Sequence, residues 1–305
     1  MSKARYLNLG FKSLTFLASL SVLAIIAGIF VCLLWESLPA LRHFGIFKFL
    51  FTADWNYAQE SFGALRPLTG TALTTFLALL FAAPVAVGTA IFLTELCPHR
   101  LRGAFGTAVE LLAAIPSVIY GMWGLFVFAP FLEASVQPLI GKTLGLLPLI
   151  GFFFQSKLAG GVNVFTASLV LAVMITPFIA SVTRDAFNQV PATLKESARG
   201  LGATQWETIR QVQIPYSRQA IGGGAIIAMG RALGETMAVA YVIGNRHAPL
   251  DSLFAPYATI TSVLANEFNE AAGLQLSSLF TLALALFLAN FLALYLGKKL
   301  LKKEL

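Results

Sequence analysis

Long apolar runs separated by polar connections dominate the chain. Six of the runs reach about 20 residues, the length that a helix needs to cross a bilayer core of roughly 30 Å. They lie near residues 13–34, 69–94, 107–131, 162–183, 219–244 and 274–297. The connections between them cover 35–68, 95–106, 132–161, 184–218 and 245–273. This pattern predicts an all-α fold, a polytopic membrane bundle of six transmembrane helices.

The composition supports lipid as the solvent. The 305 residues are 57% hydrophobic and 11% charged, with a mean hydropathy of +0.78. A soluble domain carries about 25% charged residues. The two cysteines, Cys32 and Cys97, lie far apart in the sequence, and the three histidines, His43, His99 and His247, lie in different loops. Neither set has the spacing of a disulfide or a metal site. We therefore expect no metal and no cofactor in this chain.

Basic residues are divided unevenly between the two sets of connections. Fourteen of the 21 Lys and Arg residues fall in the N-terminal segment, the 95–106 and 184–218 connections and the C-terminal tail, whereas six fall in the others. Cytoplasmic loops collect Lys and Arg, so both termini and the 184–218 loop should be cytoplasmic. This bias accounts for the net charge of +7 without a nucleic acid partner.

The first apolar run follows basic residues, as in a secretory signal. Its length of about 20 residues exceeds that of a typical cleaved signal, so the sequence predicts a retained anchor helix.

The 184–218 connection contains the signals of two short helices. Pro191 is suited to a first helical turn, because its missing N–H breaks no helix bond there. Leu194, Ala198 and Leu201 form a narrow apolar stripe, and Gly202 stands where a left-handed C-cap is expected.

A second helix should begin at Thr204, because Thr204 and Glu207 have the spacing of a capping box. Pro215 is expected to end this helix. Two short helices with a small apolar face suit a docking surface for a soluble partner. They equally suit an amphipathic hairpin on the bilayer surface, and the pattern leaves both interpretations open.

Two charges stand inside the fifth apolar run. Arg231 lies eleven residues beyond Ala220, which is roughly 16 Å into the membrane at 1.5 Å per residue. A charge at that depth costs about 2.5–3.5 kcal/mol. Glu235 follows four residues later, so the two side chains can pair on one helix face. The pair either fixes helix register or lines a polar path, in which Arg231 attracts an anion and Glu235 holds Arg231 in place.

The cytoplasmic loop resembles the "EAA" motif of ABC importer permeases. That motif reads Glu-Ala-Ala, then a glycine four residues after the second alanine, then Ile-x-Leu-Pro. The matching positions are Glu196, Ser197, Ala198, Gly202, Val212, Ile214 and Pro215, with Ser197, Val212 and Ile214 departing modestly from the motif. The resemblance implies that this loop is a coupling helix inserted into a cleft of an ATPase subunit.

The chain has no complete P-loop of its own. The nearest approach, "VQPLIGKT" from Val136 to Thr143, lacks the first glycine. The chain is therefore expected not to be an enzyme, and a partner ATPase should bind ATP and Mg²⁺.

The stretch "GRALGETMAVAYVIGN", with the later "SLFAPYATITSVLANEFNEA", closely resembles the C-type permease subunits of bacterial phosphate ABC importers. The likeness runs from about Phe62 to the C-terminus. It implies a type I ABC importer permease core at 63–305, preceded at 1–62 by a cytoplasmic tail, an anchor helix and an extracytoplasmic loop. In that family the Arg and Glu of "RALGET", here Arg231 and Glu235, are implicated in phosphate passage.

The resemblance also implies a location and partners. The chain would be a multi-pass protein of the bacterial inner membrane. It would act with a second related permease, two ATPase copies and an extracytoplasmic phosphate-binding protein, received near 35–68 and 245–273. A short helix is expected in "ATITSVLANEF".

Three alternatives stay open. The path could serve another oxyanion such as sulfate or molybdate, because an arginine alone does not separate these anions. A proton-coupled secondary transporter would use Glu235 as a proton relay, although it would need no EAA loop. A membrane scaffold or phosphate sensor would transport nothing.

Overall fold

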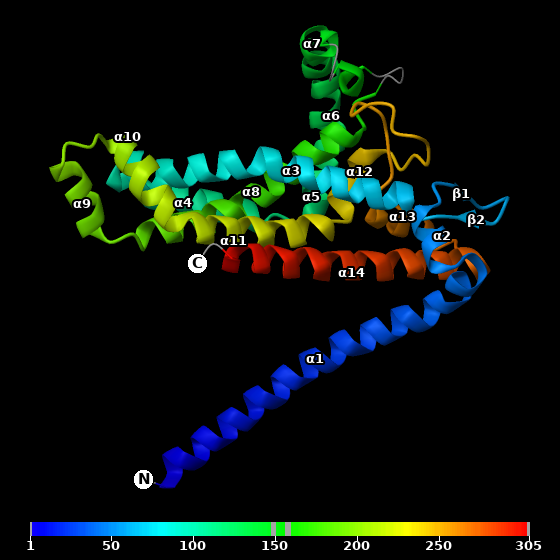
Figure 1. Ribbon diagram of the computed structural model, residues 1–305, viewed down its shortest axis with the longest axis horizontal. Coiled ribbons are helices and arrows are strands. Elements are labelled where there is room, and N and C mark those ends of the chain that lie inside the picture. The colour runs from blue at the N-terminus through cyan, green and yellow to red at the C-terminus, as the bar shows by residue number, and fades with distance from the viewer. Residues whose placement is uncertain (1, 148–150, 156–159, 304–305) are drawn as a thin grey trace.

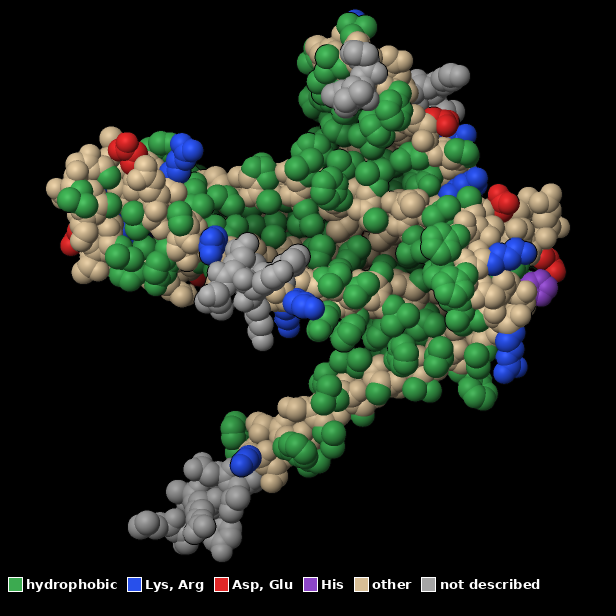
Figure 2. Space-filling view, viewed as in Figure 1, with side chains coloured by type: hydrophobic (Ala, Val, Ile, Leu, Met, Phe, Trp, Pro, Cys, Tyr) green, Lys and Arg blue, Asp and Glu red, His purple; other side chains and the backbone are tan. Residues whose placement is uncertain are grey.

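The computed structural model describes residues 2–147, 151–155 and 160–303 of the chain. Four long helices run side by side in it: α3 (Leu65–Ile91), α8 (Val164–Asn188), α11 (Ile214–Leu233) and α14 (Gly273–Lys303) (Figure 1). Figure 2 shows hydrophobic side chains over the middle of this bundle and charged side chains towards its two ends. This distribution suits a bilayer, because only the ends of a spanning bundle meet water.

Small residues bring α3 and α8 into close contact. Ala78, Ala82, Ala86 and Ala90 recur at every fourth position of α3 and are all buried. Without large side chains on that face, the backbones of two membrane helices can approach closely, and packing replaces the hydrophobic effect as the driving force. The largest hydrophobic cluster forms here, with contributions from α8, α11 and α12 (Met237–Ile243).

The described residues contain six candidate spans if a bent pair of helices is counted as one. Five helical stretches are long and apolar enough, and the pair Gln205–Leu233 and Met237–Ile243, bent by 65°, is the sixth. The predicted six-span bundle is therefore confirmed in its number and helical class. The five single stretches are Phe11–Phe44, Leu65–Leu96, Ser117–Leu146, Val164–Asn188 and Gly273–Lys299.

The third predicted span was misplaced. Instead of one helix over 107–131, the chain forms α4 (His99–Ala114), an extended residue at Ile115, and then α5 (Ser117–Trp123). Pro116 explains the break, because the residue before a proline is pushed out of the helical region.

The third span continues well into the predicted 132–161 connection. After α5, π-helical turns alternate with α6 (Ala129–Phe131) and α7 (Gln137–Thr143). Figure 1 shows α5, α6 and α7 rising steeply out of the bundle. Lys157, which was counted with the smaller set of basic residues, lies outside the described residues.

The N-terminal helix is longer than the apolar run that predicted it. Helix α1 covers Ser2–Phe44, and only its last part is joined to the bundle (Figure 1). There Ser277 of α14 donates a hydrogen bond to the carbonyl of Glu36 (2.7 Å) and accepts one from the N–H of Ala40 (3.0 Å).

The end of the bundle opposite α9 (Ala192–Gly200) carries the short elements (Figure 1). These are α2 (Ile46–Phe51), the antiparallel strands β1 (Trp55–Asn56) and β2 (Ser61–Phe62), and α13 (Ile260–Glu267). Thr259 and Ser262 form a capping box that starts α13, which confirms the short helix expected in "ATITSVLANEF".

Candidate functional site

The hairpin between α8 and α11 begins largely as its sequence predicts. Helix α9 covers Ala192–Gly200, and Gly202 follows with φ of 95°, the left-handed conformation that favours glycine. Helix α10 (Gln205–Thr208) starts with the predicted capping box. The N–H of Thr204 donates to Glu207 Oε2 (2.8 Å), and the N–H of Glu207 donates to Thr204 Oγ1 (3.3 Å).

Pro215 does not end the second helix, so this prediction was wrong. Helix α10 passes through a π-helical turn, Ile209–Gln213, into α11. In this turn the N–H of Ile214 donates to the carbonyl of Ile209. The wider turn places Pro215 in the first turn of α11, where its missing N–H breaks no helix bond. The second arm of the hairpin is consequently the start of a long helix, Gln205–Leu233, whereas α9 is a separate short helix.

Apolar side chains are exposed on the hairpin. Leu201 is 91% exposed, and Leu194 and Trp206 are exposed as well. Of the three residues that match Glu-Ala-Ala, Glu196 and Ser197 are exposed and Ala198 is half-buried. Exposed apolar side chains grouped on a small element indicate a surface that another molecule covers.

A carboxylate that the sequence did not single out joins the hairpin to the bundle. Glu95 stands in a π-helical turn at the end of α3. Its Oε1 accepts hydrogen bonds from Lys195 Nζ (2.9 Å) and Gln213 Nε2 (2.7 Å). Its backbone carbonyl accepts one from Gln205 Nε2 (3.0 Å), and Arg199 Nη2 lies 3.6 Å from Oε2. One residue thus connects α3 with both arms of the hairpin.

The fifth span is broken where it was predicted to carry a charge pair. Helix α11 ends at Leu233 and α12 begins at Met237, with the 65° bend between them. A pair four residues apart needs a continuous helix, so the predicted Arg231–Glu235 pairing on one helix face is wrong. Within the described residues no ion pair joins these two side chains.

Glu235 caps the second half of the broken helix. Its side chain is buried, and Oε1 accepts a hydrogen bond from the N–H of Ala238 (3.2 Å) in the first turn of α12. Its backbone carbonyl accepts a second bond from Thr261 Oγ1 of α13 (2.8 Å). The N-terminus of a helix favours a carboxylate through its unpaired N–H groups and its dipole. Glu235 therefore stabilises the bend.

Arg231 stands on the open side of α11. Its side chain is exposed, and its guanidinium carbon lies 4.5 Å above the ring centre of Phe178 on α8. Ile227, one turn earlier on the same helix face, is also exposed. In the described part of the chain no carboxylate neutralises Arg231. The guanidinium thus keeps its hydrogen-bond donors available to a molecule outside this chain.

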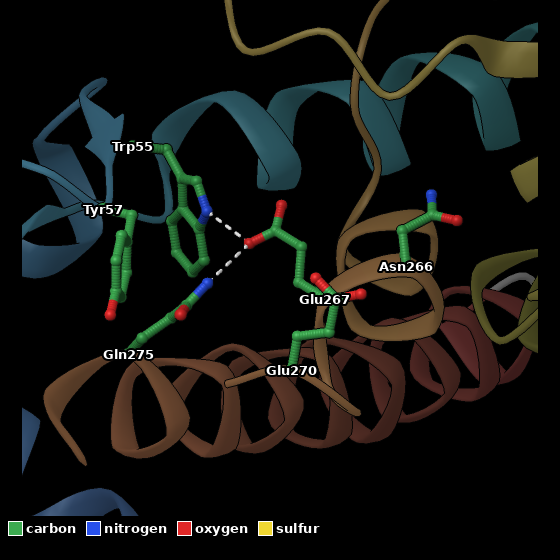
Figure 3. Close-up of a pocket in the computed structure, with 6 residues that line it drawn as sticks. All are labelled: Trp55, Tyr57, Asn266, Glu267, Glu270 and Gln275. Carbon is green, nitrogen blue, oxygen red and sulfur yellow. Dashed lines mark hydrogen bonds between the residues drawn. The ribbon is translucent and has the colours of Figure 1, made fainter. Parts of the chain in front are cut away.

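A cavity of about 500 Å³ opens beside β1 and α13 (Figure 3). Trp55 Nε1 and Gln275 Nε2 donate to Glu267 Oε2 at 2.8 and 3.2 Å, and His247 Nε2 lies 3.1 Å from Oε1. Burial raises the pKa of Glu267, but the hydrogen bonds from His247 and Trp55 outweigh it, and the pKa falls below its usual value. Tyr57 and Glu270 also line the cavity.

Sequence comparison places the chain among membrane transport components. Residues 72–302 match the family described as "Binding-protein-dependent transport system inner membrane component". The chain is 48% identical to "Phosphate transport system permease protein PstC" of Pasteurella multocida, covering 97% of this chain and 92% of that protein. The protein of the same name from Mesorhizobium japonicum is 50% identical (96% and 89% covered). "Probable phosphate transport system permease protein PstC" of Methanocaldococcus jannaschii is 34% identical (96% and 93% covered).

Solved structures share the fold. A bacterial ABC transporter that imports alginate matches with a TM-score of 0.59 at 16% identity, covering 98% of this chain and 99% of that one. A bacterial alginate ABC transporter in complex with an alginate-bound periplasmic protein matches with a TM-score of 0.61 at 17% identity (96% and 95% covered). The inward-facing MetNI methionine ABC transporter gives 0.58 at 17% identity (78% and 94% covered). These neighbours confirm the predicted ABC importer permease fold.

Proposed function

The chain belongs to the PstC family of phosphate transport system permease proteins, among the binding-protein-dependent inner membrane components, and from this membership we propose how it carries inorganic phosphate. It forms one side of the membrane path of an ATP-driven importer. ATP hydrolysis takes place in a separate subunit.

Arg231 is the anion contact of this path, and the observation that supports the role is that no carboxylate of the described residues pairs with it. A planar guanidinium donates two parallel hydrogen bonds to a tetrahedral oxyanion. Phe178 steadies the guanidinium from one side through a cation–π contact, which leaves its donors free. A second, related permease covers the open face of α11, so that phosphate passes between the two subunits.

Glu235 acts indirectly. Its carboxylate is directed at the N–H groups of α12 and is 9% exposed, so it does not face the path as an anion-repelling group. By holding the bend between α11 and α12, it positions Arg231 at the end of the first half. The predicted role of bracing the arginine directly is replaced by this capping role.

The hairpin is the site of energy coupling. A partner ATPase, present in two copies that bind ATP and Mg²⁺, contacts the exposed surface of Leu194, Leu201 and Trp206. Glu196, Ser197, Ala198 and Gly202 belong to the segment that docks. Closure of the ATPases moves the hairpin, and Glu95 passes that movement to α3 while the continuous α10–α11 helix passes it to Arg231.

The arrangement of the ends supports the orientation. Figure 1 shows α9, α10 and the C-terminus at one end of the bundle, with β1, β2 and α13 at the other. The end that bears the hairpin is cytoplasmic, as the basic residues predict. A phosphate-binding protein docks at the opposite end, where the segments 35–68 and 245–273 meet at the cavity of Figure 3.

The test compares Arg231→Gln with Arg231→Lys in the assembled transporter. We expect Arg231→Gln to abolish uptake of labelled phosphate, while Arg231→Lys retains part of it, because lysine keeps the charge but not the two parallel donors. Membrane insertion and co-purification of the ATPase serve as controls. Uptake by Arg231→Gln near the parent rate contradicts the anion role, and equal uptake of sulfate or molybdate assigns another oxyanion.

A further inference from the structure

A second cavity, of about 570 Å³, opens between α4 and α8 at the end of the bundle that carries the hairpin. It is remote in sequence from Arg231, and neither the hairpin surface nor the bend uses it. Its charged and polar lining includes His99, Arg100, Arg102, Glu110, Arg184 and Asn188.

The cavity holds more positive than negative charge. Arg184 Nη2 donates to Glu110 Oε1 (2.8 Å) and lies 3.4 Å from Asp185 Oδ1, so this arginine is neutralised. Arg100 and Arg102 form no ion pair within the described residues. The Nε atom of Arg102 is moreover buried without a hydrogen-bond partner. A buried donor of this kind is unfavourable unless an acceptor reaches it.

Gly106 lines the cavity next to Arg184. A Cβ atom at this position would lie 3.0 Å from Arg184 Nη1, closer than side chains normally come. The glycine therefore lets the Arg184 guanidinium lie against the backbone of α4. The neutralised Arg184, the exposed Arg100 and the half-buried Arg102 all line this cavity.

The surface beside the cavity is apolar. Leu101, Phe105 and Leu112 recur along one face of α4 and are exposed, as is Leu111. A helix with an exposed apolar face and basic residues at its start is typical of one that lies at the membrane interface. Basic pockets between helices on the cytoplasmic side bind anionic lipid headgroups.

We propose that the cavity between α4 and α8 binds the phosphate of an anionic phospholipid headgroup, with Arg100 and Arg102 as its cationic ligands. The acyl chains would lie along the exposed apolar face of α4. The inference rests on the cytoplasmic orientation given above, but not on the transport role of Arg231. Free phosphate shares the headgroup chemistry and reaches the same side after import, yet it gains nothing from the apolar face.

The test uses the complete transporter, purified in mild detergent, and measures the bound phospholipid by native mass spectrometry. The variant Arg100→Gln/Arg102→Gln is compared with Lys298→Gln/Lys299→Gln, which removes the same charge from exposed residues of α14 at the same end. Arg184 is left intact because it pairs with Glu110. We expect phosphatidylglycerol affinity to fall by roughly 30-fold in the arginine variant and to change little in the lysine control, since each basic residue near an anionic surface contributes about 1 kcal/mol.

Three outcomes would overturn the proposal. Equal loss of phosphatidylglycerol in both variants would show a general charge effect, and retention in both would show that the cavity is not the site. Saturable binding of inorganic phosphate that displaces the lipid, and that the arginine variant loses, would assign the cavity to the free anion. Because the readout is lipid binding, a failure here is distinguishable from a failure of the Arg231 experiment.

Discussion

Replacing Glu95 with glutamine tests whether the hairpin passes movement to α3 through this residue, as we propose. The substitution keeps the size of the side chain but removes the charge that holds Lys195. The side chains of the pair are 10% and 20% exposed. Such a pair lies between exposed pairs, worth about 0–1 kcal/mol, and buried pairs, whose disruption costs about 3–5 kcal/mol. We therefore expect a loss of about 2 kcal/mol, or roughly a 30-fold weaker connection between hairpin and α3.

The assay measures phosphate uptake and ATP hydrolysis together in proteoliposomes that contain the whole transporter. We expect Glu95→Gln to retain hydrolysis and lose several-fold in phosphate transported per ATP. Glu133→Gln, an exposed glutamate of the third span, is the charge-matched control. Lys195→Met should add little in the Glu95→Gln background, because neighbouring mutations that break one interaction are not additive. An unchanged ratio of uptake to hydrolysis, or full additivity of the two substitutions, would refute the reasoning.

Substitutions at three further positions probe the hairpin turn, the cap of α12 and the cavity beside α13. Gly202→Leu forces a branched side chain into a φ of 95°, which costs about 1–3 kcal/mol of local strain. We expect this variant to hydrolyse ATP without a matching uptake of phosphate. A ratio of uptake to hydrolysis like that of the parent would argue against docking at this turn. Glu235→Gln should keep more phosphate uptake than Glu235→Ala, because the amide oxygen still caps α12 and loss of a cap costs about 1 kcal/mol. Equal phosphate uptake by the two variants would contradict the capping role. Glu267 has a lowered pKa in the folded protein, so it contributes stability that is complete above its unfolded pKa of about 4.3 and is lost as the pH falls through its folded pKa. The thermal unfolding temperatures of the parent and of Glu267→Gln should therefore converge only in acid. Equal unfolding temperatures at neutral pH would be inconsistent with this shift.

Local signals in the sequence predicted the parts of the fold that depend on a few neighbouring residues. The apolar runs indicated the membrane helices, because a span needs about 20 such residues whatever its neighbours are. The capping box of Thr204 and Glu207 and the turn at Gly202 formed as expected, since their partners lie within one helical turn. The division at residue 62 between an N-terminal part and the core stays a prediction.

At two prolines and one glycine, neighbouring residues did not predict correctly where a helix ends. Pro116 breaks its helix, whereas a π-helical turn accommodates Pro215 within a continuous helix. The residues that flank the two prolines did not predict this difference. Gly234 ends α11, although glycine is common inside membrane helices. Its bend is held by Thr261, which donates to the carbonyl of Glu235 from a helix 26 residues further along the chain.

The contacts that give the candidate sites their chemistry belong to the tertiary structure. Glu95 meets Lys195 and Gln213 across 100 and 118 residues, and Arg184 meets Glu110 across 74. Arg231 and Glu235 were recognised from their position in an apolar run, but the bend decided that Arg231 is exposed, where we propose an anion contact, and that Glu235 caps a helix. Apart from the bounds of the third span, sequence alone thus determined which segments are apolar enough to enter the membrane, because burial in lipid depends on the composition of each segment. The packing of those segments decided which charges stay unpaired, because pairing depends on distances that only the assembled helices set.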